Sequence, residues 1–221
     1  MVTPSSIRKF RHNLLLWFEE HGRQFPWRKS SVTKYQYIIA EILLQRTRAE
    51  TIAVFYPNFI HDFPSWKRLS SASIEQLQRY LQPIGLWRRR AVSIQGLAQE
   101  IAKKNGRFPR SREEIEALPG IGQYIANSVL LFCHGEAQPL LDVNMARVIE
   151  RVFGPRKLVD IRDDPYLQAL ALKVVDCNNP ARTNWAIIDF AAMVCLPRIP
   201  KCCNCPLTTM CLYFEQFGYA D

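Results

Sequence analysis

Apolar residues recur every three or four positions along most of this chain, which is the spacing of helices that bury one face. The longest such stretch, YIIAEILLQRTRAETIAVFYPNFI (37–60), carries apolar residues at helical spacing over roughly five turns, which predicts helical structure there. Two shorter stretches, 91–105 and 144–153, predict helices that end at Gly106 and Gly154, because glycine readily takes the conformation that closes a helix. Few segments show the alternation of apolar and polar residues that is typical of strands.

Residues typical of helix starts also indicate a mainly helical protein. SIEQ, from Ser73, and SREE, from Ser111, place a glutamine or glutamate three residues after a serine, which is the spacing of a capping box. Asp164 followed by Pro165 predicts another helix start. Proline-containing segments such as FPSW and LPGIG separate the helices. We therefore predict an all-α protein of roughly ten short helices.

The composition is that of a folded, basic protein. Hydrophobic residues make up 48% of the 221 and charged residues 22%, which excludes a disordered chain and allows one core or two modest lobes. The 29 Lys and Arg exceed the 20 Asp and Glu, and the resulting charge of +9 favours a polyanionic partner such as nucleic acid.

No apolar run approaches the roughly 18–20 residues that span a membrane. Near the N-terminus, basic residues precede LLLWF (14–18), but Glu19 and Glu20 follow at once, which indicates an amphipathic helix and not an export signal. We therefore expect no membrane association and a reducing, cytoplasmic location, at the nucleoid in a prokaryote. Disulfides are disfavoured in such a compartment.

Five of the seven cysteines lie within residues 195–211. Four of them have the spacing C-x6-C-x2-C-x5-C: Cys195, Cys202, Cys205 and Cys211. A zinc site usually joins two separated ligand pairs, whereas four thiolates within one short loop suit a [4Fe–4S] cluster, in which each iron needs one cysteine. Cys203 is then the spare. The alternative is a set of buried, unligated cysteines; we predict the cluster.

The segment LPGIGQYIANSVL (118–130) predicts a tight turn between two helices. Gly120 and Gly122 lack side chains, so a DNA backbone can approach them, and the amides at the start of the next helix, near Gln123, can hold a phosphate oxygen. A Gly-x-Gly turn is often only a connection between packed helices. Between a capped helix and a helix containing Ala and Ser, it predicts a DNA-binding helix-hairpin-helix.

Two carboxylates are candidates for catalysis. Asp142 follows the apolar PLL and precedes a helix, so it is an expected N-cap, and Asn144 is placed to hydrogen-bond with it or with a DNA backbone. Glu41 lies in an apolar helical stretch and either reaches water at the helix edge or lines a pocket, where burial keeps it available as a proton donor. Two carboxylates in different environments have the division of labour that cleaves a glycosidic bond.

In this order, these features resemble the helix-hairpin-helix DNA glycosylase superfamily, in the iron–sulfur branch that contains endonuclease III, adenine–DNA glycosylases and thymine/uracil glycosylases of G mismatches. The likeness runs from FPWR (25–28) to Cys211. It implies a six-helix lobe with the hairpin at 28–135, and an iron–sulfur lobe formed by 1–27 and 136–221, whose cluster loop is 195–211. It also implies a cleft between the lobes, into which a nucleotide of bound DNA is flipped.

The resemblance implies roles for three residues. Endonuclease III has a lysine at the position of Tyr124, and its amine forms the Schiff base that enables strand cleavage. A phenol cannot form this imine, so we expect a monofunctional hydrolase with little or no lyase activity. By the same resemblance, Asp142 stabilises or attacks C1′, Glu41 assists base departure or orients water, and Tyr124 walls the pocket.

The stretches EILLQRTRA, IGLWRRRA and LLDVNMARVIERVFG look most like mismatch thymine glycosylases, so thymine or uracil opposite guanine is the expected substrate. Adenine glycosylases usually show LQQT and GLGYY in these places, and they carry a further C-terminal domain. Removal of adenine from mispairs with guanine or 8-oxoguanine is the second hypothesis. A non-catalytic DNA-binding protein is the third.

Further residues are candidates for contact with DNA. Gln45, Arg46 and Trp87 are placed to fill the stack after a base leaves it, although core packing is an equal alternative for Trp87. We also expect the cluster to order the PRIPK loop so that Arg198 and Lys201 face phosphate. The expected partner is duplex DNA with a mismatched or damaged base, bound by a monomer.

Overall fold

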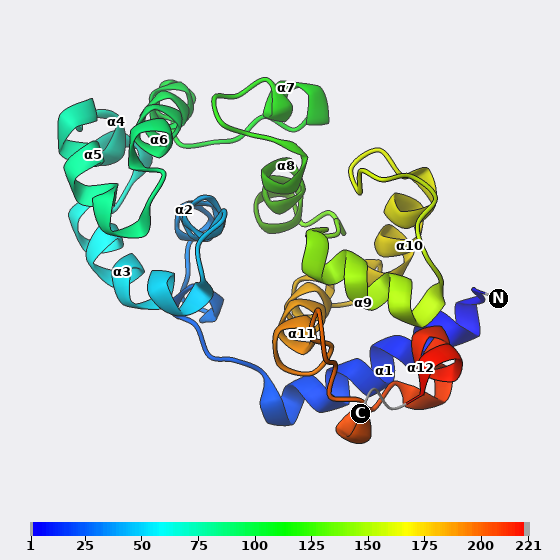
Figure 1. Ribbon diagram of the computed structural model, residues 1–221. Coiled ribbons are helices and arrows are strands. Elements are labelled where there is room, and N and C mark those ends of the chain that lie inside the picture. Colours follow the sequence, from blue (N-terminus) through cyan, green and yellow to red (C-terminus); the bar gives the residue numbers. More distant parts are fainter. Residues whose placement is uncertain (1, 219–221) are drawn as a thin grey trace. The chain divides into compact units, whose positions relative to one another are not determined.

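The computed structural model describes residues 2–218, and in this range every regular element is a helix and no strand occurs. The prediction of an all-α fold is confirmed. Contacts between elements divide the chain into two compact units (Figure 1): a terminal unit, Met1–Arg23 with Glu136–Asp221, and a central unit, Gln24–Gly135. The central unit includes Phe25 and Trp27, whose rings stack 4.8 Å apart and belong to its core.

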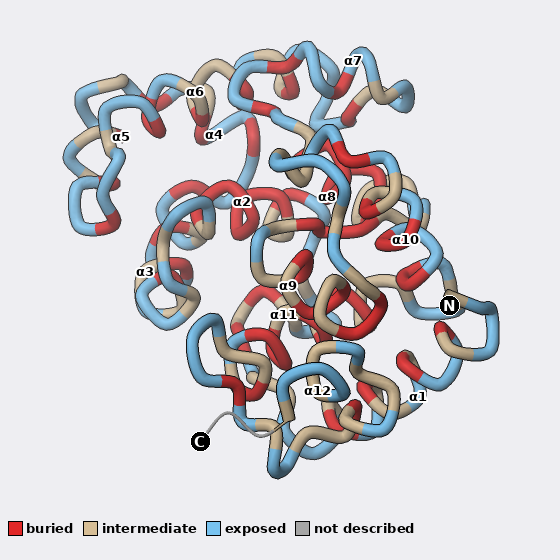
Figure 2. The backbone as a smooth tube through the Cα atoms, turned by 45° about the vertical axis from the view of Figure 1, so that its right-hand side comes forward, coloured by how far each residue is buried: buried red, intermediate tan, exposed pale blue. Residues whose placement is uncertain are grey.

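The central unit carries helices α2 to α8. Their bounds are α2 Lys34–Leu44, α3 Ala49–Asp62, α4 Trp66–Ser70, α5 Ile74–Leu81, α6 Trp87–Lys103, α7 Arg112–Glu116 and α8 Gln123–Val129, with the short elements η1 Pro26–Arg28, η2 Gln82–Ile84 and the π-helical η3 Leu130–His134. Helix α2 packs against α3 and α8, and α6 packs against α4 and α5. Figure 2 shows α2 buried along most of its length, which makes it the inner helix of this unit.

Several helices begin and end where the sequence predicts. The Ser73 and Ser111 hydroxyls cap α5 and α7 by accepting a hydrogen bond from the amide three residues further on. Asp164 caps α10 in the same way. Gly106 and Gly154, which follow α6 and α9, have φ of 78° and 112°, a region that strongly favours glycine.

The helical structure predicted over residues 37–60 is present, but it is divided between two helices. The chain forms α2 and α3, separated at residues 45–48, where Arg46 takes the left-handed conformation with φ of 56°. The carbonyl oxygen of Gln45 accepts a hydrogen bond, at 2.7 Å, from Arg90, which lies 45 positions further along the chain. The break depends on a tertiary contact, and the periodicity of apolar residues carries no information about such a contact.

The terminal unit carries the remaining helices. Their bounds are α1 Pro4–His21, α9 Val143–Phe153, α10 Pro165–Val175, α11 Pro180–Met193 and α12 Leu212–Phe217, with η4 Cys202–Asn204 and η5 Thr208–Met210. Helix α11 packs against both α1 and α9, and α12 packs against α9 (Figure 1). In the described part of the chain, none of the helices has the length and hydropathy needed to cross a lipid bilayer.

Candidate active site and cysteine loop

Glu41 and Tyr124 meet inside the central unit. Tyr124 lies in the first turn of α8, and its hydroxyl donates a hydrogen bond to Oε2 of Glu41 at 3.0 Å. Glu41 exposes only 4% of its surface, because α2 is enclosed by α3 and α8. The interpretation in which Glu41 reaches water at a helix edge is therefore excluded. Its buried carboxylate needs such a donor, since burying a charge without one is costly.

The hairpin segment has the predicted helix bounds. Helix α7 ends at Glu116 and α8 begins at Gln123. Arg112 of α7 donates a hydrogen bond to Oδ1 of Asn127 of α8 at 2.8 Å, and Asn127 exposes only 4% of its surface. This contact joins the two helices and fixes the turn between them.

The two glycines of this turn have different roles. Gly120 has φ of +73°, and a Cβ there would lie 2.7 Å from Cβ of Ser93 on α6, so packing within the protein requires glycine. Gly122 is the exposed N-cap of α8, and a Cβ there would meet nothing within 4 Å. Gly120 therefore shapes the turn, and Gly122 leaves space for an external backbone to approach.

Asp142 is the N-cap of α9, as the sequence predicts. Its Oδ1 accepts hydrogen bonds from the amides of Asn144 and Met145 at 2.9 and 2.8 Å. Its Oδ2 accepts one from Nδ2 of Asn144 at 2.7 Å. These donors hold the carboxylate in one orientation at the positive end of the helix.

The segment before Asp142 is fixed by Asn184, a residue that the sequence analysis does not identify. Asn184 lies fully buried in α11. Its Oδ1 accepts a hydrogen bond from the amide of Leu140 at 2.7 Å, and its Nδ2 donates one to the carbonyl of Gln138 at 3.0 Å. A single asparagine within a helical stretch has no periodic signature, so the pattern alone could not identify it.

Arg147 connects the Asp142 end of α9 to the chain around the end of α11. Its NH1 donates to Oδ1 of Asn144 at 3.1 Å, its Nε to the carbonyl of Cys195 at 2.9 Å, and its NH2 to the carbonyl of Ala191 at 2.9 Å. Burial lowers the pKa of Arg147, but a guanidinium starts far above neutral and keeps its charge. Asp142 and the first cysteine thus belong to one hydrogen-bonded region of the terminal unit.

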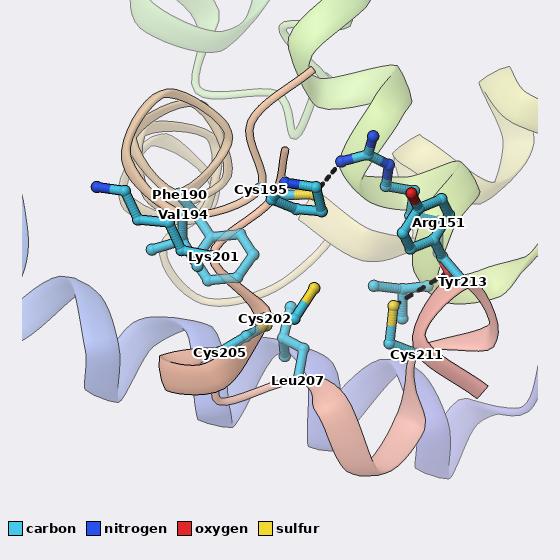
Figure 3. A pocket seen from close by; sticks show the side chains of 12 residues that line it. Arg151, Phe190, Val194, Cys195, Lys201, Cys202, Cys205, Leu207, Cys211 and Tyr213 are labelled. Atoms are coloured by element: carbon cyan, nitrogen blue, oxygen red, sulfur yellow. Dashed lines mark hydrogen bonds between the residues drawn. The ribbon is translucent and has the colours of Figure 1, made fainter. Parts of the chain in front are cut away.

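The predicted cysteines line one pocket (Figure 3): Cys195, Cys202, Cys205 and Cys211. Cys195 follows α11, Cys202 begins η4, Cys205 follows η4, and Cys211 precedes α12. The spare Cys203 is exposed and is not part of the pocket lining. Apolar side chains complete much of the wall: Val152, Phe190, Val194 and Leu207.

The thiols of this pocket are poorly hydrated. Burial raises the pKa of Cys202, Cys205 and Cys211, that of Cys205 to about 12, so these groups stay protonated at neutral pH unless a cation compensates the thiolate charge. Within residues 2–218, no three His, Cys, Asp or Glu side chains are placed to hold a single metal ion.

Arg151 of α9 holds the loop that begins at Cys195. Its NH1 donates to the carbonyl of Leu196 at 2.7 Å and to Sγ of Cys195 at 3.4 Å, and its NH2 donates to the carbonyl of Pro197 at 2.9 Å. In return, Sγ of Cys211 donates to the carbonyl of Arg151 at 3.3 Å. The same helix therefore binds both ends of the cysteine loop.

Most residues predicted to contact DNA lie on exposed loops. Gln45 and Arg46 are exposed between α2 and α3, and Arg198 is exposed in the loop after Cys195. Lys201 is exposed as well, and it also borders the cysteine pocket.

Trp87 differs from these residues. It is half-buried and packs against the core of the central unit, and the Arg88 guanidinium lies 3.9 Å from the centre of its ring. The packing interpretation therefore describes Trp87 better. Its neighbour Leu86 exposes 53% of its surface in a left-handed conformation with φ of 52°. A leucine after a glycine has no distinctive sequence pattern, so this conformation could not be predicted from the sequence.

Comparison with known proteins gives consistent matches. Residues 39–164 match the family described as HhH-GPD superfamily base excision DNA repair protein. The chain is 36% identical to a thymine/uracil-DNA glycosylase of Pyrobaculum aerophilum, over 94% of this chain and 93% of that protein. It is 29% identical to the adenine DNA glycosylase of Homo sapiens, over 94% of this chain but 40% of that protein. The structure of a thermostable thymine-DNA glycosylase matches with a TM-score of 0.88 and 30% identity, covering 96% of this chain and 98% of that one.

Proposed function

Because this chain belongs to the HhH-GPD superfamily of base excision DNA repair proteins, we propose that it is a monofunctional DNA glycosylase that removes thymine or uracil mispaired with guanine. The observation that carries the proposal is the Asp142 carboxylate fixed at the head of α9, in a chain that also holds a buried Glu41–Tyr124 pair. Similarity to a thymine/uracil and a thymine glycosylase over nearly the whole chain supports the choice of base.

The two carboxylates divide the work of hydrolysis. As the bond between C1′ and the base nitrogen breaks, positive charge develops on the sugar. Asp142 stabilises that charge, or attacks C1′, and its hydrogen bonds to Asn144 and Met145 keep it oriented for this role. Glu41, held by Tyr124, orients the water or assists proton transfer to the departing base. Water supplies the hydroxyl at C1′, and its proton ends on the base.

Tyr124 sets the outcome of the reaction. Its oxygen cannot form the imine that a lysine amine would form at this position, and its hydroxyl is bound to Glu41. The proposed product is therefore an unbroken strand that contains an abasic site.

The residues proposed to contact DNA are chosen among those that are exposed. The hairpin meets the phosphate backbone at Gly122, where a Cβ would have open space, and Arg198 and Lys201 face phosphate from the cysteine loop. Gln45 and Arg46 fill the space left by the flipped nucleotide. Leu86 takes the place predicted for Trp87, because Leu86 is exposed and Trp87 packs against the core.

We further propose that the pocket of Cys195, Cys202, Cys205 and Cys211 holds a [4Fe–4S] cluster, with one cysteine for each iron. When bound, the cluster supplies positive charge that compensates the buried thiolates, and it links the end of α11 to the start of α12. Arg151 steadies the same loop from α9. The role is structural, and exposed Cys203 is not a ligand.

Removal of adenine from a mispair is the second candidate. The identity of 29% to the human adenine glycosylase supports it, although that similarity covers 40% of the human protein. Both candidates use Asp142 and Glu41 in the same roles, so only the substrate separates them.

The direct test is base release from a labelled duplex with one central T·G mispair, with the protein in excess. We expect breaks at the mispaired thymine after alkali, which cleaves abasic sites. Asp142→Asn retains a capping side chain, so it should bind this duplex while releasing base at least about 100-fold more slowly. Binding without base release by the unsubstituted protein would favour the non-catalytic alternative.

A further inference from the structure

Three non-glycine residues of the central unit lie in the left-handed region: Arg46, Leu86 and Asn105. Arg46 and Leu86 lie in two loops that share one hydrogen-bonding partner. The first loop, residues 45–48, joins α2 to α3 and contains Arg46, with φ of 56°. The second loop, residues 85–86, lies between η2 and α6 and contains Leu86, with φ of 52°. This conformation is unfavourable for a residue with a Cβ, so it persists only where neighbouring groups fix the backbone.

The neighbouring group is the same for both loops. Arg90, in the first turn of α6, exposes 6% of its surface. Its NH1 donates to the carbonyls of Ile84 and Gly85 at 3.2 and 3.0 Å. Its NH2 donates to the carbonyl of Gln45 at 2.7 Å and to Oγ1 of Thr47 at 3.1 Å. One guanidinium thus binds both loops at once.

Thr47 strengthens the connection. Its hydroxyl accepts from Arg90 and lies 3.3 Å from the carbonyl of Ile84, to which it donates. The first loop is therefore joined directly to Ile84, the residue before the second loop, as well as to that loop through Arg90. All of these acceptors are in the backbone or on a short side chain, so the contacts fix the course of the chain itself.

We propose that Arg90 is a positioning residue for base removal: it locks the two loops into one rigid platform that presents Arg46 and Leu86 to the DNA before binding. This inference rests on the proposed function, in which these exposed side chains fill the space left by a flipped nucleotide. Flipping a base out of the duplex requires unstacking it, which costs free energy. A flexible loop would move away and would not keep its side chain in the space between the neighbouring bases. A platform ordered in advance does not lose loop entropy on binding.

The proposal requires the two terminal nitrogens of a guanidinium at position 90. A lysine keeps the charge and most of the stem, but its N–H groups share one nitrogen, whereas Arg90 places NH1 at one loop and NH2 at the other. Arg90→Lys is therefore the informative variant. Arg89→Lys, at the exposed neighbouring position on the same helix, is the matched control.

The experiment combines a rate with a spectroscopic signal. Base release is measured in single turnover at saturating protein on T·G and U·G duplexes. Unstacking is measured in the Asp142→Asn background by the fluorescence of 2-aminopurine next to the target base. We expect Arg90→Lys to slow release roughly 10- to 100-fold and to reduce the fluorescence rise by more than half, with duplex affinity changed less than about threefold. Arg89→Lys should change neither signal.

Thr47→Val provides a second, milder variant if Arg90→Lys melts at a much lower temperature. It removes the hydroxyl between the loops and should shift both signals in the same direction. Equal fluorescence in Arg90→Lys and the parent, with or without a slower rate, would overturn the positioning role. A parent protein that releases no base would instead overturn the proposed function. The two failures are thereby distinguished.

Discussion

The Nε of Arg147 donates a hydrogen bond to the carbonyl oxygen of Cys195 at 2.9 Å, which joins the helix that begins at Asp142 to the first cysteine of the loop. The same guanidinium binds Oδ1 of Asn144, whose amide group binds the Asp142 carboxylate. The cysteine loop and the carboxylate therefore share one network, so disorder in the loop is expected to reach Asp142.

Arg147→Lys should slow base release roughly tenfold, because one ammonium cannot replace N–H groups that reach Asn144, Ala191 and Cys195 together. Single-turnover rates and thermal melting measure the effect. Arg182→Lys, in an exposed ion pair with Glu19, is the control and should leave the rate unchanged. A normal rate for Arg147→Lys would show that Asp142 does not depend on this network.

Replacing any proposed cluster ligand with serine should lower iron content and the broad absorbance near about 400 nm, together with the melting temperature. The four variants are Cys195→Ser, Cys202→Ser, Cys205→Ser and Cys211→Ser. Cys203→Ser is the matched control, because Cys203 is exposed and does not line the pocket. A colourless protein that contains zinc after anaerobic purification would contradict the cluster assignment.

Tyr124→Phe removes the hydroxyl that donates to buried Glu41. We expect a loss of about 1–3 kcal/mol in the free energy of unfolding, and base release slower by roughly three- to tenfold. Tyr166→Phe, which loses a comparable bond to the carbonyl of Phe153 in the terminal unit, should lower stability without changing the rate. Equal rates for Tyr124→Phe and the parent would remove Tyr124 from the site.

Arg198→Ala and Lys201→Ala should each reduce the slope of log affinity against log salt by about 1, because each would remove one phosphate contact. Titration of a mismatched duplex at several salt concentrations gives the slope. Lys173→Ala, at an exposed position on α10, serves as the charge-matched control. Unchanged slopes for both loop variants would place the PRIPK loop away from DNA.

Features set by local chemistry could be predicted from the sequence. The Asp142 cap and the turn between α7 and α8 each depend on residues close together in the chain, and the structure has both. The four cysteines predicted to bind the cluster line one pocket. The spacing of the cysteines sets Cys203 apart from the other four in this segment, and Cys203 is exposed.

Features set by distant contacts could not be predicted in this way. Arg46 and Leu86 have left-handed backbones in the two loops that Arg90 binds, and the neighbours of Arg90 in sequence give no sign of what its guanidinium binds. Asn184 is similar, since its role depends on the segment of residues 138–140 that packs beside it.

The measurement that tests the central claim most directly is single-turnover base release on duplexes carrying T·G, U·G, A·G and A·8-oxoguanine, each with and without alkali. The proposed function predicts breaks at T·G and U·G that appear only after alkali. Breaks confined to the adenine mispairs would assign the second substrate class, and breaks without alkali would contradict the role given to Tyr124.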